Sequence, residues 1–194
     1  DDTLYNTDSR LMYFLVKCED TNGTILWAKN ITNSYNFVAD NPYQGKIGVD
    51  SNGNVYVAGG FIGKTTSFAT TTLTNADTSG ITSDIFVAKY TPAGGLVWAK
   101  GIGGEKEERA RHYDPISFTV TKSGNSYLSL AYLSPSVTLG ATTITNPGPI
   151  GTRYCFLAKM DGGGNFIWAK PMSKSIVISA LATDAIENIY ATGN

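Results

Sequence analysis

Short apolar phrases and turn-forming residues alternate along this chain, and the same phrases return at a fixed interval. Two apolar residues followed by Trp-Ala-Lys occur three times, at Trp27, Trp98 and Trp168. Nine or ten residues before each tryptophan, a Lys closes a second apolar phrase, which contains Phe14, Phe86 or Phe156. Between the two phrases lie Asn, Asp, Pro and Gly residues of the kind that tight turns need. Each copy therefore predicts a β-hairpin.

A second hairpin pattern lies between these copies. It covers residues 49–57 and 120–128, and more weakly 182–190, and each copy carries one tyrosine in its second strand: Tyr56, Tyr127 and Tyr190. A shorter phrase, Thr-Leu-Thr-Asn at 72–75, returns as Thr-Ile-Thr-Asn at 143–146. We expect it to form an extra edge strand or an ordered loop. Two hairpins in each interval give four strands.

The pattern predicts an all-β chain with almost no helix and about twelve principal strands. The expected hairpins span residues 12–30, 46–61, 84–101, 116–133, 154–170 and 176–192.

Tandem four-stranded antiparallel units without a helix are typical of β-propeller blades. Stacking such blades buries both faces of each sheet, so we expect the repeated Trp, Phe and Tyr at blade contacts. We interpret residues 1–194 as one propeller segment, with approximate units at 1–30 (partial), 31–101, 102–170 and 171–194 (partial). These units make about three blade-equivalents, so we expect them to belong to a larger or oligomeric propeller.

Three phrases, at residues 49–61, 84–90 and 94–104, resemble the SBBP-type bacterial β-propeller repeats. The resemblance covers nearly the whole chain and is strongest in the second copy. The hairpin that ends in Trp is also distantly similar to blades of quinoprotein-like propellers, where a tryptophan docks against the next blade. The resemblance implies a propeller fold and an extracellular setting, secreted or at the cell surface, because such repeats are common in large secreted and surface proteins of Bacteroidetes. It supplies no catalytic residue.

Charge and hydropathy exclude two kinds of partner. The 15 basic and 16 acidic residues leave a net charge of −1. Such a balance gives no field that favours nucleic acid. No apolar run approaches the roughly 20 residues that a membrane-spanning helix needs, so we expect neither nucleic-acid binding nor membrane insertion.

Two groups of side chains suggest chemistry. Oxygen-bearing residues at 20–23 and 50–54 stand near glycines, but they lack the bidentate Glu and flanking helices of an EF-hand, and we interpret them as turns. Cys18 and Cys155 stand at non-equivalent repeat positions, and we interpret them as small apolar core thiols. We therefore predict neither a metal nor a cofactor.

The segment 105–114 holds the only histidine and the densest charge in the chain. Its residues Arg109, Arg111, His112 and Tyr113 could form a polar contact loop or supply a general base, but we favour a solvated connector. Tyr113 could also stack on a sugar face, together with Tyr35 and Tyr43 from other loops.

No nucleophile elbow, phosphate loop or His/Cys metal cluster is present in the sequence, so we expect no enzyme. The leading prediction is a scaffold or adhesive binding module whose partners are proteins or glycans at the cell surface. The alternatives are a lectin-like propeller, and part of a propeller enzyme whose site lies in other blades. The ends of the chain are out of phase with the repeat. We therefore expect a mature or excised portion of something longer, completed by further blades or by a second copy.

Overall fold

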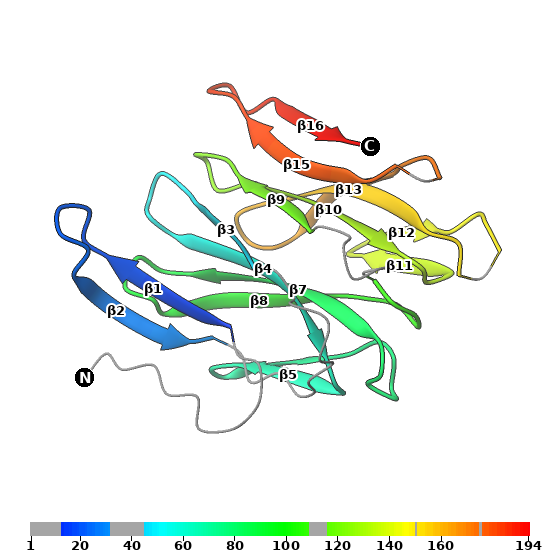
Figure 1. Cartoon of the computed structure of the whole chain (residues 1–194), viewed down its shortest axis with the longest axis horizontal. Coiled ribbons are helices and arrows are strands. Elements are labelled where there is room, and N and C mark those ends of the chain that lie inside the picture. Colours follow the sequence, from blue (N-terminus) through cyan, green and yellow to red (C-terminus); the bar gives the residue numbers. More distant parts are fainter. Residues whose placement is uncertain (1–12, 32–44, 109–115, 150, 175) are drawn as a thin grey trace.

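The computed structural model describes residues 13–31, 45–108, 116–149, 151–174 and 176–194, and every regular element in these ranges is a β-strand (Figure 1). The strands are β1 (Phe14–Cys18), β2 (Ile25–Asn30), β3 (Lys46–Val49), β4 (Val55–Ile62), β5 (Thr65–Phe68), β6 (Thr71–Thr74), β7 (Ser83–Tyr90), β8 (Leu96–Ile102), β9 (Ser117–Val120), β10 (Ser126–Tyr132), β11 (Ser136–Leu139), β12 (Thr142–Thr145), β13 (Tyr154–Met160), β14 (Phe166–Pro171), β15 (Ile178–Thr183) and β16 (Ile189–Gly193). The all-β prediction and the positions of all six expected hairpins are confirmed.

Two four-stranded antiparallel sheets form the centre of the molecule, in the orders β3-β4-β7-β8 and β9-β10-β13-β14. The hairpins β1–β2 and β15–β16 are separate two-stranded sheets on either side of them (Figure 1). The repeated Tyr, Lys and Trp stand opposite one another across three strands of each central sheet, as Tyr56–Lys89–Trp98 and Tyr127–Lys159–Trp168. Equal registers show that the two sheets are copies of one structural unit.

The Thr-Leu-Thr-Asn phrase forms an additional hairpin rather than a single edge strand. It supplies β6, which pairs with β5, and the second copy supplies β12, which pairs with β11. The closing asparagine of each phrase fixes the loop that follows, because the Asn75 amide donates to the Thr82 carbonyl at 2.8 Å and the Asn146 amide donates to the Thr152 carbonyl at 2.7 Å. Strands β5, β6, β11 and β12 account for the difference between the sixteen strands of the described residues and the twelve or so expected.

The central strand β7 is buried on both faces because its side chains alternate in direction. Ile85 and Val87 belong to the hydrophobic cluster shared with the β9-β10-β13-β14 sheet. Phe86 and Ala88 belong to a second cluster, which includes Leu15 of the β1–β2 hairpin. The sheets are therefore stacked face to face along the chain.

Exposure of the repeated aromatic residues depends on the sheet that carries them. The repeated tyrosines and phenylalanines of the two central sheets are buried, namely Tyr56, Phe86, Tyr127 and Phe156. The three tryptophans are half-buried. Phe14 and Tyr190, which stand at equivalent repeat positions, are exposed because they lie on the two-stranded flanking hairpins. The prediction of a core thiol is right for Cys155 and wrong for Cys18, which is exposed at the end of β1.

Successive units are joined by a repeated contact, here called the Lys–Trp pair. The Trp98 indole N–H and the Lys89 ammonium both donate to the Gly162 carbonyl, each at 3.1 Å. Gly162 lies in the turn between β13 and β14 of the next unit. One pair therefore ties one sheet to the turn of the following one.

The same contact occurs one unit earlier. The Trp27 indole N–H donates to the Pro92 carbonyl at 3.1 Å, and the Lys17 ammonium donates to the same oxygen at 3.4 Å. Pro92 lies in the turn between β7 and β8. The recurrence explains why Lys and Trp repeat together in the sequence.

Glycine is required where the next turn meets the indole. Gly164 has a φ of +81°, and a Cβ placed on it would lie 3.0 Å from a ring atom of Trp98. That distance is shorter than ordinary van der Waals contact, and a positive φ disfavours any other residue. Both constraints select glycine at this turn.

Replacing Trp98 by Ala is expected to lower the free energy of unfolding by about 3 kcal/mol, because the indole packing and one hydrogen bond are lost. The matched control is Val97→Ala, which removes a half-exposed neighbour on the same strand and is expected to cost less than about 1 kcal/mol. Urea midpoints measure both values. Equal, small losses would show that Trp98 is a surface aromatic and not a contact between units.

Candidate functional site

The sequence-predicted binding residues lie outside the described residues. This holds for the charged-loop residues Arg109, Arg111, His112 and Tyr113, and for the loop tyrosines Tyr35 and Tyr43. The first part of the charged segment, residues 105–108, is described. A candidate site must therefore be built from that segment and from the described surfaces.

The carboxylates of the hairpin turns have partners within their own turns. Asp50 accepts hydrogen bonds from the Asn52 and Asn54 backbone N–H groups, both at 2.9 Å, and from the Asn54 amide at 2.8 Å. Asp161 and Asp184 accept the equivalent bonds in their turns. Burial raises the pKa of Asp50, but these hydrogen bonds outweigh it and hold the pKa below its usual value.

These turns also contact one another from unit to unit. The Ser51 hydroxyl donates to the Lys122 carbonyl at 2.7 Å, and the Ser123 hydroxyl donates to a Glu187 carboxylate oxygen at 2.8 Å. The oxygen-rich residues therefore stabilise turns and stacking. Among the described residues, no group of three or more His, Cys, Asp or Glu side chains is placed to hold a metal ion.

A buried pair of acids lies between the two central sheets. Glu108 has no exposed surface and Asp84, near the start of β7, is 2% exposed. One oxygen of each carboxyl group, Asp84 Oδ1 and Glu108 Oε2, has no hydrogen-bond partner among the described residues. The Ser134 hydroxyl, which follows β10, donates to Glu108, and the Ala76 backbone N–H donates to Asp84 at 2.8 Å. Side chains from both sheets thus meet at this pair.

Burial determines how the acid pair ionises. Burial, together with the nearby charge of Asp84, raises the pKa of Glu108 to about 8, and burial raises the pKa of Asp84 to about 6. At neutral pH the Glu108 carboxyl therefore keeps its proton. Because the pair is inaccessible to a substrate, its chemistry is structural.

The sequence interpretation missed this pair, because it placed Glu108 in a solvated connector. A run of Glu, Lys and Arg gives no pattern that separates a buried acid from exposed ones. The available signal was the pair Gly103-Gly104. A Cβ on Gly103 would lie 2.1 Å from the Asp84 carboxylate, and one on Gly104 would lie 2.5 Å from the Ser134 hydroxyl. The glycines leave the space that the acids and their partners occupy.

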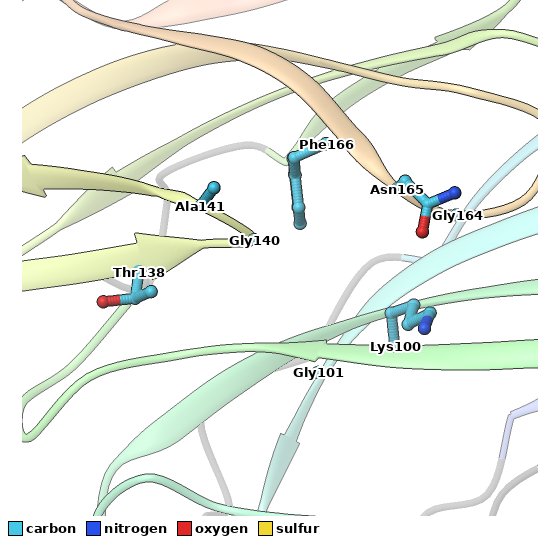
Figure 2. Close-up of a pocket in the computed structure, with 8 residues that line it drawn as sticks. All are labelled: Lys100, Gly101, Thr138, Gly140, Ala141, Gly164, Asn165 and Phe166. Atoms are coloured by element: carbon cyan, nitrogen blue, oxygen red, sulfur yellow. The ribbon is translucent and has the colours of Figure 1, made fainter.

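An open hollow of about 350 Å³ lies on the surface between the two central units (Figure 2). Its lining consists of Lys100, Gly101, Thr138, Gly140, Ala141, Gly164, Asn165 and Phe166. Figure 2 shows the Phe166 side chain pointing into the space between the ribbons that carry Thr138 and Lys100. A cation, an amide, a hydroxyl and an aromatic ring can together contact a polar ligand.

Comparisons with known proteins add no relative. No protein-family model matches this chain, and no curated protein matches it. The resemblance to bacterial propeller repeats therefore stays a prediction from the sequence.

The acid pair predicts a pH-dependent stability. The pKa of Glu108 in the folded chain lies above its ordinary value of 4.5, so the unfolded chain releases this proton first as the pH rises. Stability should be fullest below pH 4.5 for this group and should fall towards pH 8, by up to about 1.4 kcal/mol per pH unit. Urea unfolding at several pH values between 5 and 8 measures this slope.

The variant Glu108→Gln keeps the hydrogen bonds but cannot ionise, so its stability should change less over the same interval. Glu105→Gln makes the same substitution at an exposed position of the same segment and should keep the wild-type slope. Identical slopes in the wild type and in Glu108→Gln would contradict the assignment.

Proposed function

We propose that this chain is a β-propeller segment that acts as a secreted or cell-surface scaffold and adhesive binding module, and that it has no catalytic role. The propeller interpretation is supported by two four-stranded sheets of equal register and by the Lys–Trp pair that recurs between successive units. The extracellular setting is supported by the resemblance to secreted bacterial repeats. No described helix is long and apolar enough to span a membrane.

One observation carries the binding role. The residue before each tryptophan is a half-exposed aliphatic side chain on an outer strand: Leu26 on β2, Val97 on β8 and Ile167 on β14. We call these three residues the aliphatic row. Its members occupy equivalent positions, so the repeat presents the same apolar group three times. Exposed apolar side chains that gather in one patch mark a protein-binding surface, and a row repeated from unit to unit would form such a patch.

A lectin-like function is the second candidate, and the hollow between the central units favours it. Thr138 and Lys100 are exposed polar residues there, and Phe166 supplies an aromatic ring. Aromatic rings that stack on sugars beside hydrogen-bonding groups would suit a glycan. The hollow is open, so any such ligand would be held at the surface.

Binding measurements on immobilised extracellular-matrix proteins and on a glycan array distinguish the two candidates. We expect saturable binding to a matrix protein, weakened at least about tenfold when the aliphatic row is changed to Thr at all three positions. The control variant Ile81→Thr/Ile186→Thr alters two highly exposed aliphatic residues outside the row and should bind as the wild type does.

The lectin would be supported, and the protein-binding proposal overturned, by a chain that binds no matrix protein but binds glycans. That glycan binding should be lost in Lys100→Ala and in Thr138→Ala. Absence of binding both to the matrix proteins and to the glycan array would contradict a binding role altogether.

A further inference from the structure

The flanking hairpins each have the form of half a central sheet. Strand β1 matches β7 and β13 in sequence pattern, yet within the described ranges it pairs only with β2. Strand β16 matches β4 and β10, and in the same ranges it pairs only with β15. In the central sheets the equivalent strands pair with each other, as β4 with β7 and β10 with β13. The edges of β1 and β16 are therefore complementary.

We propose that β16 of this chain pairs with β1 of a second copy, and that the reciprocal pairing closes two copies into a ring of six sheets. Six four-stranded sheets lie within the range of roughly four to eight blades in which propellers close, whereas the two four-stranded sheets and two half-sheets of one copy lie below it. The inference rests on the propeller architecture of the proposed function and not on its ligand, so the binding assay and the experiment below fail independently.

The central sheets fix the register of this pairing. Tyr56 stands opposite Lys89 in one sheet, and the equivalent tyrosine stands opposite Lys159 in the other. By the same rule Tyr190 stands opposite the partner copy's Lys17. The residue before the tyrosine then stands opposite the residue after the lysine, which places Ile189 opposite the partner copy's Cys18.

This register completes an aromatic arrangement that is half-formed in a single copy. The Lys89 ammonium lies 4.9 Å from the centre of the Tyr56 ring, and the Trp98 ring centre lies 6.1 Å from the same tyrosine. Tyr190 is 59% exposed in a single copy. In the paired sheet, Lys17 and Trp27 of the partner copy take the places of Lys89 and Trp98.

The same placement satisfies an unused Lys–Trp pair. Trp168 and Lys159 repeat the residues that elsewhere bind a turn carbonyl, but no turn carbonyl within the described ranges accepts from them. Gly162 is the third residue after Lys159, and Pro92 is the third after its own lysine. The equivalent carbonyl after Lys17 is that of the partner copy's Asp20.

In a single copy, the turn between β1 and β2 has free space beside Gly23, where the partner copy's Trp168 would lie. Gly23 has a φ of +73°, and a Cβ on it would meet nothing within 4 Å. The equivalent Gly164 lies against the Trp98 indole. The partner copy's Gly23 therefore has room for the Trp168 indole in the same position.

A third surface is covered by the same pairing. Ile47 and Val49 on β3 are more than half exposed. On β9, the residue equivalent to Val49 is Val120, which packs against Gly48 of the preceding unit. Pairing β16 with β1 brings the β15–β16 hairpin of one copy over the β3 residues of the other. The free strand edges, the Lys159–Trp168 pair without a turn carbonyl and the exposed residues of β3 are thus all completed by the same partner. A second copy of this chain carries the complementary group for each of them.

Cross-linking through the native Cys18 tests the register. Cys18 is exposed, and Ile189→Cys would place a second thiol opposite it across the new sheet, within disulfide reach. Under mild oxidation we expect a covalent dimer on a non-reducing gel, with a peptide that links positions 18 and 189. Thr192→Cys is the matched control, because it lies three residues along β16, about 10 Å away, and should not link to Cys18. Cys18→Ser combined with Ile189→Cys should also stay monomeric on the gel.

Light scattering on the wild-type chain provides a measurement that needs no variant, and the mass should be twice that of one chain. A wild-type mass of one chain would overturn the proposal. If the wild-type chain is a dimer but Ile189→Cys forms no more covalent dimer than Thr192→Cys does, the proposed register is also wrong. A ladder of larger covalent multimers would contradict closure by two copies.

Discussion

The stacking of this chain depends on the carbonyl of a hairpin turn that accepts two donors from the preceding unit. The indole N–H and the ammonium of one Lys–Trp pair converge on the Gly162 oxygen, and the pair that precedes it does the same at Pro92. A charged donor strengthens such a bond, and the partly covered indole shields it from water. The positive φ of Gly164 allows that turn to approach the ring. The repeated Lys, Trp and turn glycine are therefore all required by the same contact between successive units.

A second point of attachment lies at the other end of β7. Asp84 is near the start of this strand and the turn that carries Pro92 follows its end. The acid pair and the turn contact thus flank the apolar side chains of a strand that is buried on both faces. The proton that Glu108 keeps at neutral pH avoids two charges in a buried place. The hydrophobic cluster supplies most of the interface, and the polar contacts fix its register.

The repeats predicted the strands and hairpins well because each phrase combines a period-two apolar pattern with a turn that only a few residue types can form. Residues 84–101 could be assigned as a hairpin for that reason alone. The β5–β6 and β11–β12 hairpins were harder to assign, since Thr-rich strands without a strong apolar face resemble loops. The candidate site could hardly be predicted, because the burial of Glu108 depends on Ser134, 26 positions away, and on glycines that leave space for the acids. The exposure of Cys18 likewise depends on which strand lies beside β1.

Hydrogen exchange of the indole N–H groups, followed by NMR on ¹⁵N-labelled protein, tests the turn contact most directly. The Trp27 and Trp98 indole N–H groups should exchange at least about tenfold more slowly than that of free tryptophan, because each is bonded to a turn carbonyl. Exchange of both groups at the rate of free tryptophan would show that the repeated tryptophans do not join the units, and the stacking described above would be wrong.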